Sequence, residues 1–390
     1  MKLDDILDNE NVRLREFPVA QERAFFGNAG VAPLPRVAAD ALAEFGRLGS
    51  HDSQENDATW AVDAACRESA ARMLGATAAE IALVGPTSYG LNLVALGLAW
   101  EPGDEVVYYA DDYPANVYPW SGLTGRGVKP VPLAPAHTGA ITWDVVARAI
   151  TPKTRLVALA SCHFMSGFRI DVDDIGRRLH ERGILFCLDG IQTLGAFPVS
   201  VDHVDFLSAD SHKWLLGPLG AGIFYVKASR QALLPPALLG SWNTISPDFV
   251  AQTEIGYQTG GRRYETGALN FPGIFGMAAS FDLLLELGID AIGERLLHLR
   301  RFILDHVRPL GYRLYLEDWD QREDAEDKHR SSIVCIHHPD KDMQAVYEKL
   351  HAHKITVSLR KNRAGQAFLR FSPHFYNTEA ELARAFQLLA

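Results

Sequence analysis

The strongest constraint on the fold of this chain is an alternation of short apolar runs with helical segments. Helical patterns at 91–96 and 172–183 separate runs of four or five mostly apolar residues at 81–84, 105–109, 156–160, 185–189, 204–207 and 223–226. Short apolar strands separated by helices predict a mostly parallel sheet that is covered on both faces. Ligands of such sheets bind at the carboxyl ends of the strands, so polar residues that follow these runs are candidates for a site.

The size and charge of the chain narrow the class of protein. Its 390 residues, 47% of them hydrophobic, predict a large core and two domains. A net charge of −10 with interspersed acids and bases argues against nucleic acid as a partner. No apolar run is long enough to cross a bilayer, and the acidic start 1–5 lacks a signal-peptide core, so we expect a cytoplasmic protein without a membrane partner. Four scattered cysteines predict reduced core residues and no metal site: Cys66, Cys162, Cys187 and Cys335.

Two charged residues stand at strand ends where a permanent charge is costly. Lys213 lies in the turn between the runs 204–207 and 223–226, and Asp189 ends the run 185–189. Burial lowers the pKa of a lysine and frees its amine as a nucleophile. An isolated lysine in a turn is usually just an exposed residue. Here it occurs with an aspartate, and pyridoxal phosphate (PLP) chemistry requires this pair: the lysine bonds to the aldehyde of the cofactor, and the aspartate contacts its pyridinium nitrogen. The sequence therefore predicts a PLP site with Lys213 and Asp189 as its catalytic residues.

Other enzymes with this architecture leave motifs that are missing here. No GxGxxG follows the first strand, as a Rossmann dehydrogenase would require, and no GxSxG marks a serine hydrolase. A strand, a small polar turn and a helix start do follow one another through 81–96, which is the arrangement of a phosphate site. Thr and Ser are also ordinary helix N-caps, so this turn alone is weak evidence.

The chain resembles the class V aminotransferase family over nearly its whole length. The resemblance rests on Asp189-x-x-Gln192, on Ser211-His212-Lys213-Trp214 and on Gly217-Pro218-x-Gly220, and it runs from Phe26 to Thr378. That family includes cysteine desulfurases, isopenicillin N epimerase-like proteins and kynureninase. The resemblance implies PLP as cofactor and a PLP-dependent transferase of fold type I, an α/β protein.

The resemblance also implies roles for residues around the cofactor. Lys213 would carry PLP as a Schiff base, and Asp189 would keep the ring nitrogen protonated. Tyr113 stands where desulfurases have a histidine that stacks on the ring, and Phe164 stands where they have an asparagine, which leaves Gln192 for the phenolic oxygen. The remaining cofactor contacts implied are Ser88, the backbone of Tyr89, Asp210, His212 and Asn270. Asp210 is expected to point away from the phosphate and to orient a neighbour. His163 is a weaker candidate for the site.

Substrate recognition is implied at two places. Arg370 matches the family's carboxylate-binding arginine, whose planar fork suits a bidentate partner, and Asn28 lies in a segment that lines the substrate site. The loop 360–366, where desulfurases carry a nucleophilic cysteine, contains none. Persulfide formation on the enzyme is therefore not expected.

The resemblance further implies a homodimer. Residues 266–270 match a segment that reaches the cofactor phosphate of the partner subunit, although Ala268 replaces a frequent threonine. For domains, we expect an N-terminal arm at 1–20, a large PLP-binding domain at 21–271 and a smaller α+β domain at 272–390.

The sequence leaves the reaction open beyond its first step. With a small amino-acid substrate, loss of the α-proton can lead to transamination, to Cβ–S or related lyase chemistry, or to epimerisation. Transamination is the preferred interpretation. A non-catalytic protein with this fold is the alternative of a different class, and retention of Lys213 and Asp189 speaks against it.

Overall fold

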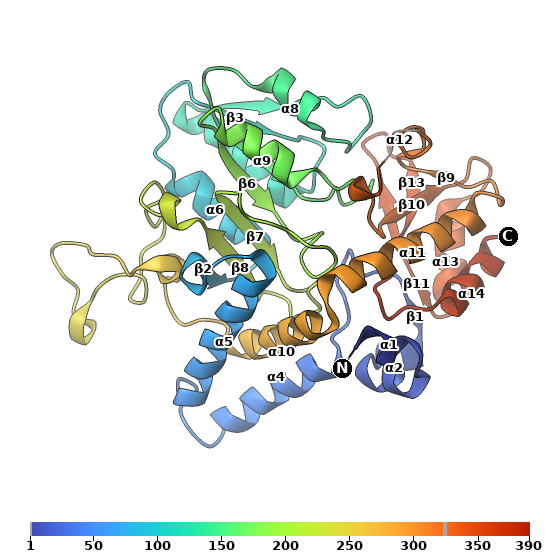
Figure 1. Cartoon of the computed structure of the whole chain (residues 1–390), viewed down its shortest axis with the longest axis horizontal. Coiled ribbons are helices and arrows are strands. Elements are labelled where there is room, and N and C mark those ends of the chain that lie inside the picture. The colour runs from blue at the N-terminus through green and yellow to red at the C-terminus, as the bar shows by residue number, and fades with distance from the viewer. Residues whose placement is uncertain (1, 323–325) are drawn as a thin grey trace.

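A computed structural model describes residues 2–322 and 326–390 and divides the chain into a larger and a smaller body (Figure 1). The larger body is built on a seven-stranded sheet in the order β2-β8-β7-β6-β5-β3-β4. Its strands are β2 (Ile81–Val84), β3 (Glu105–Tyr108), β4 (Lys129–Pro132), β5 (Thr154–Ala160), β6 (Leu185–Asp189), β7 (Phe206–Asp210) and β8 (Gly222–Val226). β8 runs antiparallel to both of its neighbours, while β3, β4, β5, β6 and β7 pair in parallel. The predicted α/β fold with a mostly parallel sheet is confirmed.

Both faces of this sheet are buried, which explains why its strands are apolar throughout. In β3, Val107 packs into the core on one face while Val106 packs into a separate core on the other, and the same alternation continues in β5 and β6. A strand covered on both sides needs apolar residues at every position. The edge strand β4 is the exception, because it contains Lys and Pro residues. Such residues are tolerated in a strand whose outer edge forms no hydrogen bonds with another strand.

Helices cover the sheet and connect its strands. Those of the larger body are α4 (Arg36–Gly49), α5 (Asp57–Leu74), α6 (Thr87–Gly97), α7 (Tyr118–Ser121), α8 (Trp143–Ala149), α9 (Val172–His180) and α10 (Phe271–Leu287). α5 ends at Gly75, whose φ of 67° is the left-handed conformation that glycine adopts easily. α6 begins directly after the turn that follows β2, so its N-terminus opens at the carboxyl edge of the sheet.

The smaller body is α+β. A four-stranded antiparallel sheet has the order β12-β13-β10-β9, with β9 at Arg313–Leu314, β10 at Val334–His337, β12 at Ser358–Lys361 and β13 at Ala367–Phe371. Its helices are α11 (Ile289–Val307), α12 (Glu317–Asp320), α13 (Met343–Ala352) and α14 (Glu379–Leu389). No described helix is long and apolar enough to cross a membrane.

The N-terminal segment is more structured than the single short helix expected for residues 1–20. The N-terminal arm forms three short helices, α1 (Leu3–Leu7), α2 (Glu10–Glu16) and α3 (Val19–Glu22), and then β1 (Ala24–Phe25), which pairs with β11 (Ile355–Thr356). Phe26 belongs to the core of the smaller body, so the arm ties the two bodies together.

Helix α10 is apolar nearly all round and packs on α4 and α5 of the larger body. The boundary between the two bodies therefore lies nearer Gly288 than residue 272.

Candidate active site

A cavity of about 520 Å³ lies between the carboxyl edge of the large sheet and the sheet of the smaller body. The larger body lines it with residues that follow four of its strands: Ser88 after β2, Tyr113 after β3, Phe164 after β5, and Asp189 with Gln192 at and after β6. Lys213 and His212 enter it from the turn after β7, and Arg370 enters it from β13. The topology therefore brings most of the predicted site residues into one space.

Lys213 is held in a strained turn. Its side chain is only 7% exposed, and its Nζ lies 5.2 Å from the centre of the Tyr113 ring. Leu216, three residues on, has φ 57°, and the turn closes through a hydrogen bond from the N–H of Gly217 to the carbonyl of Ser211 at 2.8 Å. A side chain at Gly217 would clash with Ser211, so only glycine fits there. Strain of this kind survives where the surrounding structure enforces it, and it is often found at functional sites.

The electrostatics of the cavity suit an amine nucleophile. Burial lowers the pKa of Lys213 below the ordinary lysine value of 10.5, against the opposing effect of the Asp189 carboxylate. Burial raises the pKa of Asp189, and the neighbouring Asp112 carboxylate adds to that increase. Only one oxygen of Asp189, Oδ1, accepts a described hydrogen bond, from the N–H of Ile191 at 3.0 Å. A cationic ring nitrogen beside Asp189 would offset the cost of its buried charge.

Gln192 is fixed by its neighbours. Its Nε2 donates to the carbonyl of Ala29 at 3.1 Å, and its Oε1 accepts from Nε1 of Trp214 at 2.8 Å. The orientation of the amide is therefore set, and its second N–H can serve a ligand in the cavity.

The turn before α6 offers backbone donors. Ser88 lines the cavity, and the described hydrogen bonds give the N–H groups of Thr87 and Ser88 no acceptor. The N–H of Tyr89, by contrast, donates to the carbonyl of Pro86 at 2.8 Å, and Tyr89 lies outside this cavity. The predicted contact through the Tyr89 backbone therefore finds no support in this geometry, while Ser88 remains well placed.

Asp210 does not line the cavity and instead contacts a residue that does. Its Oδ2 lies 3.0 Å from Nδ1 of His212 and accepts a hydrogen bond from the N–H of Gly220 at 3.3 Å. Among the described residues, Nδ1 of His212 and Oδ1 of Asp210 have no partner with hydrogen-bond geometry. Asp210 thus sits where it can orient His212, and its place outside the cavity lining gives no support to a direct contact with the cofactor.

Two predicted residues are turned away from the cavity. Asn28 is fully buried, with Nδ2 donating to the carbonyl of Ser372 at 3.0 Å and Oδ1 accepting from the hydroxyl of Tyr376 at 3.2 Å. Asn270 caps α10 through Gly273 and donates to the carbonyl of Gly220 at 3.0 Å. Asn28 therefore secures the chain near the site, and Asn270 lines a different space from the cavity.

His163 has a structural place. Its Nδ1 accepts from the N–H of Ser166 at 3.1 Å, and its Nε2 lies 3.1 Å from the carbonyl of Asp111. Burial lowers the pKa of His163 to about 4, so the ring is neutral and fully engaged.

Arg370 is a buried cation with free hydrogen-bonding capacity. It is 1% exposed, its Nη1 donates to the carbonyl of Phe164 at 2.9 Å, and its Nε has no partner among the described residues. Burial lowers the pKa of Arg370 to about 10, which still leaves it charged near neutral pH. A buried, half-satisfied guanidinium in a cavity is suited to binding a carboxylate.

Sequence reasoning missed Asp112 and Arg360 as site residues. Asp112 accepts from the N–H of Tyr113 at 2.7 Å and from Nδ2 of Asn116 at 3.2 Å, and burial raises its pKa to about 6. Its position directly before Tyr113, a predicted site residue, could have indicated that Asp112 lies near the site. Arg360 lines the cavity from β12.

The residues around the cavity fit PLP. The partly unpaired Asp189 carboxylate suits the ring nitrogen, the Tyr113 ring suits its face, and the free donors at Ser88 suit the phosphate. His212 also lines this cavity, and its Nδ1 faces the Asp210 carboxylate at 3.0 Å. The described atoms therefore leave unmet polar groups where such a ligand would meet them.

Comparison with known proteins agrees with this chemistry. Residues 24–385 match the family Aminotransferase class-V. A probable cysteine desulfurase from Methanothermobacter thermautotrophicus is 29% identical over 292 residues, which cover 73% of this chain and 72% of the relative. A probable cysteine desulfurase from Xylella fastidiosa (strain Temecula1) is 25% identical and covers 95% of this chain and 93% of its own.

Solved structures share the fold. The apo structure of a cysteine desulfurase from Thermococcus onnurineus NA1 superposes with a TM-score of 0.86 at 23% identity, covering 97% of this chain and 96% of that one. The cystine C–S lyase C-DES in complex with its reaction product, cysteine persulfide, superposes with a TM-score of 0.84 at 21% identity, covering 96% and 98%.

Proposed function

Because this chain belongs to the class V aminotransferase family of PLP-dependent enzymes, we propose that it binds PLP in the 520 Å³ cavity and acts on the α-carbon of an amino acid. The observation that carries the proposal is the pairing of Lys213 and Asp189, both buried, in one cavity with opposite shifts of pKa. Oppositely perturbed titratable groups in a cavity are typical of catalytic sites.

Five residues of the cavity would contact different parts of the cofactor. Asp189 would hold the ring nitrogen, Tyr113 the ring face, Gln192 the phenolic oxygen, and Ser88 with His212 the phosphate end. Bound there, PLP supplies an electron sink for the pair left when a bond to the α-carbon breaks.

The chain's own groups then direct the reaction. The guanidinium of Arg370 holds the substrate carboxylate and so fixes which bond of the α-carbon faces Lys213. With its lowered pKa, the amine of Lys213 can be neutral near physiological pH, accept the α-proton at Nζ and deliver it to a neighbouring carbon. Tyr113 and Phe164, whose ring centres are 5.6 Å apart, form an aromatic part of the cavity lining.

Transamination is the reaction that we propose. It needs one group that moves a proton between two carbons, and Lys213 is such a group. The residues described as lining the cavity include no cysteine, and all four cysteines of the chain are buried elsewhere. Formation of a persulfide on the enzyme is therefore not part of the proposal.

Elimination of a β-substituent is the second candidate. It is favoured by the names of the curated relatives, which are cysteine desulfurases. Expulsion of sulfur from the β-carbon starts with the same proton transfer at Lys213 and requires no enzyme thiol.

A single-turnover experiment separates these reactions. The PLP-loaded protein is mixed with a panel of amino acids without a keto-acid acceptor, and cofactor and products are identified. Pyridoxamine phosphate with a keto acid would support transamination, whereas intact PLP with pyruvate, alanine or sulfide would support the lyase. Unchanged PLP with an inverted α-carbon would indicate an epimerase. No spectral response to any amino acid would contradict the proposed function.

We further propose that the protein is a homodimer in which residues 266–270 reach the cofactor phosphate of the other copy. In one copy these residues do not line the main cavity; they line a separate space of about 280 Å³ beside Gly85 and Gly220. Light scattering should give twice the chain mass of 43.0 kDa, and a monomeric protein with full activity would contradict this proposal.

A further inference from the structure

The turn that carries Lys213 is contacted by a buried histidine from the segment between β13 and α14. Trp214 directly follows Lys213 and is 1% exposed, and its carbonyl oxygen lies 3.1 Å from Nε2 of His374, which is fully buried. No other described residue donates a hydrogen bond to this carbonyl. Because a buried carbonyl without a donor is costly, the contact from His374 stabilises the turn.

The surroundings of His374 fix which ring nitrogen carries the hydrogen. Nδ1 accepts a hydrogen bond from the N–H of Phe375 at 2.9 Å. The ring is neutral near physiological pH, because burial lowers the pKa of His374 to about 4. Its single ring hydrogen therefore lies on Nε2, which donates to the Trp214 carbonyl. The backbone N–H of His374 donates to Oδ1 of Asn377 at 2.9 Å, so the position of the imidazole is also set.

The side chain of Trp214 extends this contact to the cavity. Its Nε1 donates to Oε1 of Gln192 at 2.8 Å, and its ring centre lies 5.3 Å from that of His374. The packing around the carbonyl is tight, since a Cβ atom on Gly195 would lie 2.4 Å from the Trp214 oxygen. Trp214 thus joins His374 to Gln192, which lines the cavity.

The backbone of the turn needs support because it is strained. Leu216, two residues after Trp214, has a φ of 57°, in the left-handed region that leucine rarely adopts. Ser280 of α10 donates to the carbonyl of Leu216 at 2.9 Å, and His374 donates to the same turn from a different element. Strain persists only where the surrounding structure enforces it, so these two donors hold the turn in one conformation.

On the premise of the proposed PLP function, we propose that His374 is a positioning residue for Lys213 and Gln192. His374 does not line the cavity and acts through the carbonyl and the indole of Trp214. It keeps the amine of Lys213 directed into the cavity and the amide of Gln192 in place. His374 follows Arg370 by four residues. The segment that would bind the substrate carboxylate therefore also fixes the turn that would bond to the cofactor.

The test separates the hydrogen-bond donor of His374 from its volume. His374→Met fills the space without a donor, whereas the amide Nε2 of His374→Gln can replace the imidazole Nε2. The PLP-loaded proteins are placed in D₂O with an amino acid that they bind, and NMR measures exchange of its α-hydrogen, the proton that Lys213 would move. His374→Met should slow this exchange about 10- to 100-fold, because a small misplacement of the amine is costly. The substrate Kd should change by less than twofold, and His374→Gln should recover most of the rate.

The matched control is His329→Met. Nδ1 of His329 also lies 2.7 Å from a backbone carbonyl, that of Arg169, but His329 does not line the cavity and does not contact the Lys213 turn. This variant should leave the exchange rate unchanged. If His374→Met does not fold, His374→Asn replaces it, because its shorter amide does not reach the Trp214 carbonyl.

The outcomes distinguish the inference from the function on which it rests. Exchange as fast in His374→Met as in the unaltered protein would overturn the inference alone. Equal slowing in His374→Met and His374→Gln would also overturn it, because the ring would then act by packing and not as a donor. An unaltered protein that exchanges the α-hydrogen of no amino acid would instead contradict the proposed function.

Discussion

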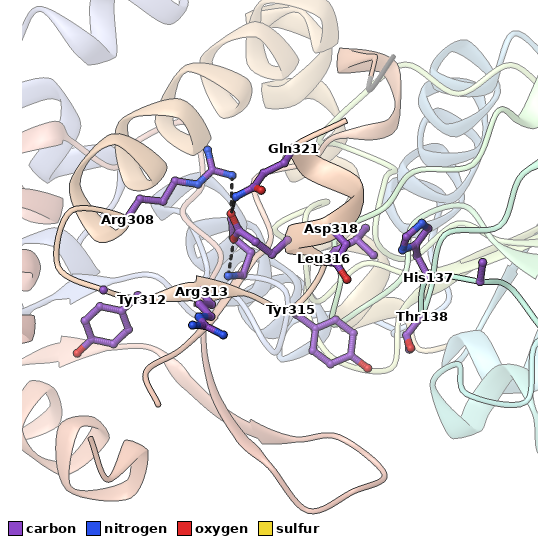
Figure 2. A pocket seen from close by; sticks show the side chains of 13 residues that line it. His137, Thr138, Arg308, Tyr312, Arg313, Tyr315, Leu316, Asp318 and Gln321 are labelled. Carbon is purple, nitrogen blue, oxygen red and sulfur yellow. Dashed lines mark hydrogen bonds and ion pairs between the residues drawn. The ribbon is translucent and has the colours of Figure 1, made fainter. Parts of the chain in front are cut away.

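The cavity that we assign as the active site and a second, larger cavity differ in how their polar groups are satisfied. The larger one, of about 790 Å³, lies between residues 308–321 of the smaller body and the segment 136–138 of the larger body. Figure 2 shows Arg308, Gln321 and Asp318 around it, with His137 and Thr138 facing them from the other segment. By volume alone it would be the preferred site.

Several polar groups at the larger cavity already have partners. Arg308 pairs with Asp320 at 2.9 Å and with Glu317 at 3.3 Å, and Gln321 donates to Glu317. Among the described residues that line it, no buried side-chain atom lacks a hydrogen-bond partner. The smaller cavity instead is lined by Arg370, whose buried Nε has no described partner, and by a buried lysine of lowered pKa. Unmet hydrogen-bonding groups and perturbed pKa values identify a site better than volume does.

The largest effect should come from removing the amine of the smaller cavity. Lys213→Ala should abolish the absorption band of PLP bonded to the protein and lower turnover by at least about 10² to 10⁴-fold, because both nucleophile and proton carrier are lost. Absorption spectroscopy of the purified variant with added PLP checks this. A normal band in that variant would mean that another amine carries the cofactor. Lys227→Ala is the control, because Lys227 is half-buried directly after β8 and does not line the cavity.

Arg370→Gln should weaken substrate binding without releasing the cofactor. Loss of a buried cation from a carboxylate site costs about 2 to 5 kcal/mol, or about 30-fold or more in Kd. Titrations of PLP and of amino acid into the same variant separate the two affinities. Equal loss of both would make Arg370 a structural residue that supports Phe164.

The pH dependence of cofactor uptake should reveal the lowered pKa of Lys213. Only the neutral amine attacks the aldehyde, so the uptake rate of the cofactor-free protein should rise with pH and reach its midpoint below 10.5. The Asp189 carboxylate raises the pKa of Lys213, so Asp189→Asn should move the midpoint to still lower pH. Stopped-flow absorbance gives the rates. Asp318→Asn in the larger cavity should leave the midpoint in place, and a shift to higher pH in Asp189→Asn would contradict the assigned coupling.

The smallest effect is expected in the larger cavity. Arg313→Gln should change turnover and PLP affinity by less than twofold and stability by about 0.5 kcal/mol or less, because Arg313 is exposed and has no side-chain partner among the described residues. Steady-state kinetics and thermal unfolding measure both. A marked loss of activity would show that the larger cavity takes part in the reaction. The assignment of the smaller cavity alone as the active site would then be wrong.

The site residues that come directly after strands in the sequence were predictable. Lys213, Asp189, Ser88 and Tyr113 each come after an apolar run, and parallel strands bring such residues to one edge. The roles of these residues remain predictions, but their meeting in one cavity was expected from local pattern. Asn28 lay beyond this reasoning, because its side chain is committed to Ser372 and Tyr376, far away in the sequence.

Sequence alone determined the sheet, its buried faces and the lysine–aspartate pair, because each depends on the order of apolar and polar residues over a few positions. Only the tertiary structure decided that Asp112 acts on Asp189, that Arg360 stands beside Arg370 near Gly30, and that Arg308 at the larger cavity is paired with Asp320. These relations join segments from different strands and from both bodies. Their distances depend on how the bodies pack, and no local periodicity encodes that.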